Sequence, residues 1–112
     1  MENYPHLTFH ELSERNIAVL RVNGGLALEH RKVFQSLCGQ LLSSRMEKKV
    51  IDLSRATGIF SIYYGSLADL CQQAGKTSSP ITVLVNPRIH DLFLKANLAD
   101  LVSMVQVPVP AS

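Results

Sequence analysis

Asp52 and four histidines are among the residues of this sequence whose side chains could move protons or hold a metal. Asp52 has no histidine or glutamate beside it to complete an acid–base pair, so we expect it to cap or orient the loop that follows. The histidines are dispersed, and no cysteine stands at metal-site spacing from any of them. We therefore expect neither a catalytic centre nor a metal site. The four are His6, His10, His30 and His90.

The segment Gly75-Lys76-Thr77 is similar to the end of a phosphate-binding loop. Such a loop also needs an earlier glycine, at the position where Leu70 stands, and a strand leading into it. The apolar spacing before Gly75 indicates a helix instead, so we expect Gly75 to be a left-handed cap at the end of that helix. No nucleotide or other cofactor is expected.

A strand-to-helix turn, residues 58–66, is unusually rich in large side chains for a solvated loop. In one interpretation Ser61 caps the helix and the tyrosines belong to the core or its rim. In the other, the turn is an exposed binding surface, since tyrosine offers a large rigid contact area at small entropic cost. The large side chains are Ile59, Phe60, Ile62, Tyr63 and Tyr64.

The elements that would position this turn follow from hydrophobic periodicity. Short β-branched runs predict strands, the first two forming a hairpin, and three- and four-residue apolar spacing predicts helices. The order β-β-α-β-α-β-α-β implies an α/β fold, with a mixed and mostly parallel sheet of about five strands and three to four helices. The strands are expected at residues 7–12, 17–22, 50–53, 81–85 and 102–107, and the helices at 28–45, 61–75 and 87–96.

Composition limits the class of protein. With 112 residues, of which 46% are hydrophobic, we expect one domain, residues 1–112, around one core. Eleven basic and nine acidic residues form no long run of one sign, which argues against nucleic acid as a partner. No apolar stretch is long enough to span a membrane, and the first residues lack a secretory pattern. Cys38 and Cys71 are predicted to be reduced core thiols, which fits a cytoplasmic protein.

At this point the sequence resembles the STAS domain family, which includes anti-sigma-factor antagonists, stressosome proteins and accessory subunits of lipid transporters. The resemblance covers nearly the whole chain and implies the STAS fold and a bacterial, non-catalytic protein that binds other proteins. It depends on the order and spacing of loose motifs. These are Val50-Ile51-Asp52-Leu53-Ser54 leading into residues 59–65, Leu84-Val85-Asn86-Pro87, and Leu92-Phe93 through Asn97-Leu98-Ala99-Asp100-Leu101.

The family's phosphorylation loop, Asp-Ser-Ser-Gly-Leu-Gly, falls on residues 60–65 of this chain. The resemblance makes Ser61 the candidate phosphorylated serine, and Gly65 keeps the last glycine. Phe60, Ile62 and Tyr63 replace the aspartate, the second serine and the first glycine. These bulky residues could obstruct a kinase, so we expect phosphorylation less than docking.

A second departure lies after the second strand, where Asn23-Gly24-Gly25-Leu26-Ala27 resembles the family's Gly-Glu-Leu-Asp element. Ala27 replaces the aspartate. The family fold places this element beside the phosphorylation loop, so a phosphate at Ser61 would face fewer repelling carboxylates and the positive end of a helix.

Two functions from different classes remain open after these observations. The first is a regulatory module that docks on a GHKL-type anti-sigma kinase or another signalling protein. The second is an accessory subunit that binds the ATPase of an ABC-type lipid transporter. Self-association into a homodimer is also open. The expected partner-binding residues are Gly24, Gly25, Ala27, Phe60, Ser61, Ile62, Tyr63, Tyr64, Gly65 and Ser66.

Overall fold

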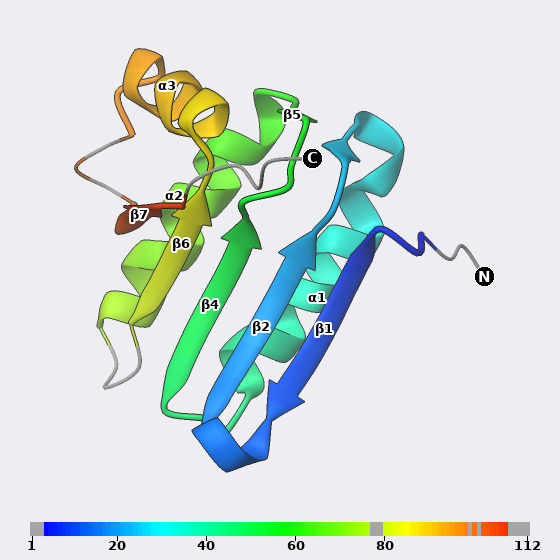
Figure 1. Cartoon of the computed structure of the whole chain (residues 1–112), viewed down its shortest axis with the longest axis vertical. Helices are drawn as coiled ribbons and strands as arrows, with labels where there is room; N and C mark the ends of the chain where they lie inside the picture. Colours follow the sequence, from blue (N-terminus) through cyan, green and yellow to red (C-terminus); the bar gives the residue numbers. More distant parts are fainter. Residues whose placement is uncertain (1–3, 77–79, 99, 101, 108–112) are drawn as a thin grey trace.

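A five-stranded sheet forms the centre of the computed structural model, which describes residues 4–76, 80–98, 100 and 102–107 (Figure 1). The strands lie in the order β1-β2-β4-β6-β7, with β1 antiparallel to β2 and every other neighbouring pair parallel. The predicted mixed, mostly parallel sheet is therefore confirmed. The strands are β1 (Leu7–Leu12), β2 (Ile17–Val22), β4 (Lys48–Leu53), β6 (Ile81–Val85) and β7 (Met104–Gln106).

The hairpin between β1 and β2 closes through a 3₁₀ turn, Ser13–Arg15, and a left-handed Asn16 with φ 57°. Asparagine tolerates this conformation because its short polar side chain can bond locally. Here the Asn16 carbonyl accepts from the Lys48 N–H at 3.0 Å, and its side-chain oxygen accepts from the Glu47 N–H at 3.0 Å. The turn thus also fixes the start of β4.

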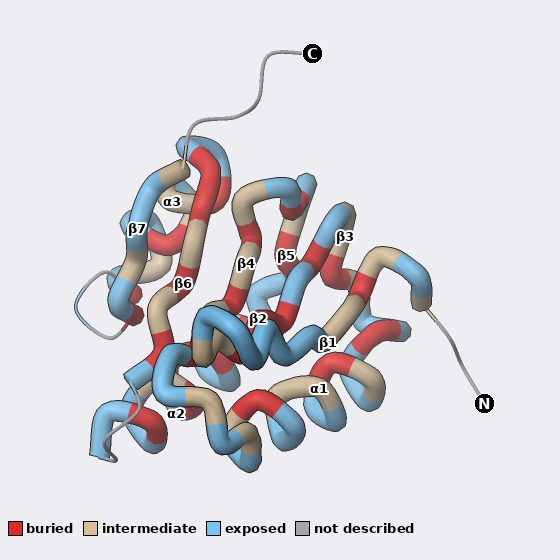
Figure 2. Tube along the Cα trace, turned by 60° about the horizontal axis from the view of Figure 1, so that its bottom comes forward, coloured by how far each residue is buried: buried red, intermediate tan, exposed pale blue. Residues whose placement is uncertain are grey.

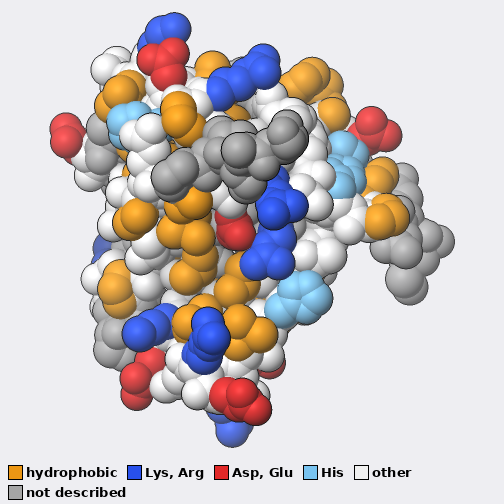
Figure 3. All heavy atoms as spheres, viewed as in Figure 1, with side chains coloured by type: hydrophobic (Ala, Val, Ile, Leu, Met, Phe, Trp, Pro, Cys, Tyr) orange, Lys and Arg blue, Asp and Glu red, His pale blue; other side chains and the backbone are white. Residues whose placement is uncertain are grey.

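Two helices, α1 (Arg31–Ser43) and α2 (Ile62–Gly75), lie side by side across one face of the sheet (Figure 2). Alternate strand residues point toward them, so that Ile51 and Leu53 of β4 and Val83 of β6 are fully buried. The intervening Val50 and Leu84 are partly exposed on the opposite face, where Figure 3 shows apolar side chains between separate basic ones.

The third helix, α3 (Pro87–Lys95), has Asn86 as its N-cap. The Asn86 side-chain oxygen accepts from the Ile89 N–H at 2.9 Å, and its amide donates to the carbonyls of Ser54 and Ala56 at 3.1 and 3.0 Å. Asn86 therefore caps α3 and also holds the loop after β4. At the other end, Asn97 is left-handed, with φ 59°.

The helix ends differ from those predicted by up to three residues, and two of the differences have a clear cause. Gly75 is not a left-handed cap, because α2 includes it and ends at a right-handed Lys76, whose N–H donates to the Gln73 carbonyl at 3.3 Å. The first predicted helix begins with a separate 3₁₀ turn, Leu28–His30, because the His30 ring accepts the Ala27 N–H at 3.0 Å and caps that turn. Thr77, Ala99 and Leu101 lie outside the described residues.

A second, two-stranded sheet was not predicted from the sequence. It pairs β3 (Gly25–Leu26) with β5 (Gly58–Ile59) in parallel. Strands of this length show no periodicity, so no pattern could indicate them. Their pairing joins the loop after β2 to the loop after β4, at the edge of the sheet where the candidate site lies.

Candidate functional site

Four backbone interactions hold the two loops of the candidate site together. Gly25 pairs with Gly58 and Leu26 with Ile59 in the small sheet. The Thr57 N–H donates to the Gly24 carbonyl at 2.9 Å, and the Phe60 N–H donates to the Leu26 carbonyl at 3.1 Å. The neighbourhood of the two elements that the family resemblance implied is therefore present.

Gly24 is the position in these loops that requires glycine. Its φ of +152° is one that L-residues rarely adopt, and an added Cβ would lie 3.4 Å from Cδ2 of His6. His6 in turn hydrogen-bonds the Gly25 carbonyl through Nε2 at 3.0 Å. The path of the loop over the His6 ring thus depends on the absent side chain.

An aromatic cluster beneath this loop was missed by the sequence analysis. The rings of Tyr4 and His30 lie 4.5 Å apart, and those of His6 and His30 lie 4.6 Å apart, both edge to face. His30 also accepts the Ala27 N–H, as described above. No local signal could have found the cluster, because His30 is far in the sequence from Tyr4 and His6.

A shallow hollow of about 370 Å³ opens beside the small sheet. We call it the corner hollow. Its walls are mostly backbone and apolar side chains, and it brings together Gly25, Ala27, Phe60 and Tyr64 of the predicted set. Leu92 of α3 also lines the hollow and was not among the predicted binding residues. The full lining is Gly25, Leu26, Ala27, Thr57, Gly58, Ile59, Phe60, Tyr64 and Leu92.

Two large apolar side chains protrude at the rim of the hollow and at the start of α2. Phe60 is 50% exposed and Ile62 is 42% exposed. Ser61 lies between them and is also exposed. Large apolar side chains exposed next to one another are typical of surfaces that bind another molecule.

Tyr63 is not part of this exposed surface, and its predicted place there is wrong. Only 2% of Tyr63 is exposed, its ring packs edge to face on Phe34 at 5.2 Å, and its hydroxyl donates to the Ala27 carbonyl at 2.6 Å. Burial raises the pKa of Tyr63, and Arg31 nearby opposes that rise. The helical turn points this side chain inward, so that it links α2 to the loop after β3.

Ser61 stands directly before α2, but its side chain accepts no hydrogen bond from the helix. Two backbone N–H groups at the start of α2 are already used, since those of Tyr63 and Tyr64 donate to the carbonyls of Phe60 and Ser61 at 3.0 and 3.1 Å, respectively. No acidic residue lies in the first turn. The hydroxyl is thus exposed, and no carboxylate of that turn opposes a negative charge on it.

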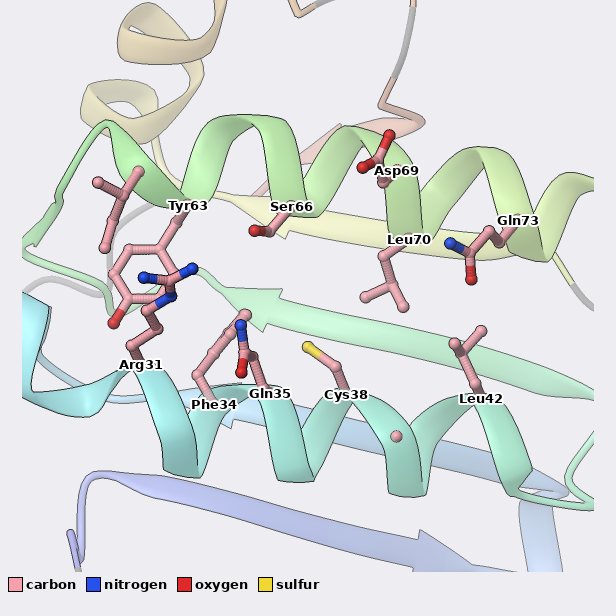
Figure 4. Close-up of a pocket in the computed structure, with 12 residues that line it drawn as sticks. Arg31, Phe34, Gln35, Cys38, Leu42, Tyr63, Ser66, Asp69, Leu70 and Gln73 are labelled. Carbon is pink, nitrogen blue, oxygen red and sulfur yellow. The ribbon is translucent and has the colours of Figure 1, made fainter.

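The other predicted residues divide between the two sides of α2. Tyr64 is half-buried at the hollow, where its ring lies 5.8 Å from that of Phe93. Ser66 is exposed and faces α1 instead (Figure 4). Gly65 is exposed, and a Cβ added there would meet no atom within 4 Å. The ten residues therefore do not form one continuous surface.

Asp52 has the role predicted for it, because it orients the loop after β4. Its carboxylate accepts from the Ser54 N–H at 3.0 Å and the Ser54 hydroxyl at 2.6 Å, and it pairs with Arg21 at 3.1 Å. Burial favours a higher pKa for Asp52, but the hydrogen bonds from Ser54 and the Arg21 charge together lower it below its ordinary value.

Both cysteines are free thiols and only partly exposed. Burial, with a smaller contribution from the neighbouring Cys71, raises the pKa of Cys38 to about 12. In residues 4–76, 80–98, 100 and 102–107, no three His, Cys, Asp or Glu side chains gather to hold a metal. None of the helices described in these ranges combines the length and apolar character of a membrane span.

Comparison with known proteins identifies the fold. No family model matches the sequence, and no curated protein matches it. The structure is similar to the crystal structure of a "putative anti-sigma factor antagonist" from Thermotoga maritima, with a TM-score of 0.72 and 16% sequence identity. The match covers 90% of this chain and 86% of that chain. The chain therefore has the STAS-domain fold, as the sequence resemblance implied.

Proposed function

We propose that this chain is a non-catalytic regulatory module of the anti-sigma-factor-antagonist kind, which docks on a GHKL-type anti-sigma kinase through the corner hollow and its rim. The observation that carries the proposal is the exposure of Phe60 and Ile62 beside an apolar hollow. The similarity of the fold to an anti-sigma factor antagonist supports the class of partner.

The rim and the hollow supply complementary features for docking. Phe60 can enter a pocket of the partner, and burying an aromatic side chain removes on the order of 150–250 Å² from water. A partner side chain can occupy the hollow, where Gly25 and Gly58 let it approach the backbone closely. An aromatic anchor surrounded by apolar contacts is the usual composition of an interface hot spot.

Docking in this proposal does not require phosphorylation. Phe60 and Ile62 flank the Ser61 hydroxyl, where phospho-regulated members of the family carry smaller side chains. A kinase that closes on small residues would meet these two first. We therefore expect a stable complex with unmodified Ser61.

Titration calorimetry against the purified anti-sigma kinases encoded near this gene tests the proposal. Phe60→Asp should weaken binding at least about tenfold, because a charge would be buried in an apolar contact. Leu12→Asp is the matched control, since Leu12 is 45% exposed and is the last residue of β1. That strand finishes at the end of the sheet far from the hollow (Figure 1). Equal affinities for Phe60→Asp and wild type would refute the surface.

Two further readouts sharpen the test. Intact mass measurement after incubation with the kinase and ATP should show no added phosphate, and a phosphate at Ser61 would contradict the unmodified complex. A neighbouring ABC-type ATPase should be titrated in parallel. Binding to that ATPase, with no binding to the kinases, would replace the regulatory function with the transporter one.

A further inference from the structure

A groove separates α1 from α2 on the outer side of the molecule (Figure 4). Its volume is about 330 Å³, within the usual size of small-molecule sites. The helices run in the same direction, with Arg31 and Tyr63 at one end of the groove and Leu42 and Gln73 at the other. We call it the interhelical groove. Its lining is Arg31, Phe34, Gln35, Cys38, Gly39, Leu42, Ile62, Tyr63, Ser66, Asp69, Leu70 and Gln73.

The floor of the groove is apolar. Phe34 and Tyr63 are each 2% exposed and Leu70 is 7% exposed, while Cys38 is partly exposed. The Tyr63 hydroxyl already donates its proton to the Ala27 carbonyl, so that proton is not available to a ligand on the floor. A ligand that lies along this floor must be apolar over most of its length.

Charged groups stand at two places along the rim. Arg31 lies at the end where both helices begin, and among the described residues no carboxylate pairs with it. Asp69 lies on α2, further along the groove from that end. An anionic head is therefore favoured at Arg31, and a second negative charge further along the groove is opposed by Asp69.

Gly39 keeps the middle of the groove open. It is exposed in the interior of α1, where glycine is less favourable than any other residue except proline. A Cβ added at Gly39 would meet no atom within 4 Å, so no close approach of neighbouring atoms requires glycine there. A side chain at this position would instead occupy space in the groove that it lines.

We propose that the interhelical groove binds an amphipathic monocarboxylate, a saturated acyl chain with its carboxylate on Arg31. The helical rise places Leu42 about 16 Å along the axis from Arg31, which is long enough for an extended acyl chain such as decanoate. An elongated floor favours a chain over a compact ring system. Ile62 lines this groove and also stands at the rim used for docking, but Arg31 and Gly39 line the groove alone, so ligand binding there needs no protein partner.

Decanoate titrated into the intact chain by calorimetry tests the site. We expect one saturable site with an affinity better than about 1 mM, and amide NMR shifts centred on Cys38 and Gly39. Arg31→Gln should weaken decanoate at least about tenfold and leave the affinity for decanol unchanged, because decanol has no charge to lose. No saturable binding to the wild type would overturn the proposal.

Gly39→Leu provides the second test. The variant should remain folded, since leucine is a better helix former than glycine, and it should lose decanoate because its side chain fills the groove. Gly65→Leu is the matched control, because Gly65 is also an exposed helical glycine with free space around it and does not line the groove. Unchanged decanoate affinity in folded Gly39→Leu would place the ligand elsewhere and refute the site.

Discussion

The corner hollow and the interhelical groove lie on either side of the first turns of α2, but different parts of the chain shape them. The hollow is framed mainly by backbone, through the β3–β5 pairing and the positive φ of Gly24. The groove is framed by side chains that project from two regular helices. A surface built on backbone is sensitive to substitutions that alter φ, whereas a surface built on side chains is sensitive to their volume.

Removing a side chain from the floor of the groove should have the largest effect on stability. Phe34→Ala leaves a cavity at a site that is 2% exposed, so we expect a loss of about 3–4 kcal/mol in the free energy of unfolding. Urea denaturation followed by circular dichroism measures it. A loss below about 1 kcal/mol would mean that neighbouring side chains refill the space and that the groove is not held in shape by its floor.

A single methyl group at the hollow should have a smaller effect on stability and a clear one on docking. Gly24→Ala forces an L-residue into a φ of +152° above His6, at a cost of about 2 kcal/mol. The strained loop should also weaken partner binding. Gly65→Ala, on an exposed helical position, is the control and should be neutral or stabilising. A Gly24→Ala variant as stable as the wild type would show that the loop can follow another path.

The hydrogen bond that links the two regions should contribute less to stability. Tyr63→Phe removes the hydroxyl that donates to the Ala27 carbonyl and keeps the ring on Phe34. We expect a loss of about 1 kcal/mol in stability, together with faster amide hydrogen exchange around Ala27. Unchanged exchange there would show that the bond does not restrain the loop.

Protonation of Asp52 should have the smallest effect on the free energy of unfolding. The effect should be absent near pH 7 and grow below about pH 4. The pKa of Asp52 is lower in the folded chain than in the unfolded chain, so its contribution is present above the unfolded value of about 3.9 and is lost as the pH falls through the folded value. Denaturant midpoints from pH 7 to pH 2.5 should decline more steeply for the wild type than for Asp52→Asn. Parallel curves would contradict the lowered pKa.

The strands and most helix boundaries could be predicted because their signals are local. The hairpin strands follow from two β-branched runs, and the start of α3 follows from Asn86 and Pro87, whose capping geometry depends on neighbours only three residues away. The predicted left-handed cap at Gly75 was wrong because it, too, was based on a local signal. Glycine permits the left-handed conformation, but nothing in the chain requires it there.

The candidate site was harder to predict because its geometry depends on distant residues. The β3–β5 pair unites loops that are far apart in sequence, and Leu92 reaches the hollow from a third element. Tyr63 and Phe60 have similar apolar character, yet one is buried and the other exposed. Which of them faces solvent is set by the direction in which α2 leaves β5, and hydrophobicity alone contains no information on that direction.

The hydrogen bond from Tyr63 to Ala27 has a consequence for the entropy of association. The loop beside the hollow is restrained before any partner arrives. Less backbone freedom is then lost on complex formation, and a contact of modest area can be tighter than its size suggests.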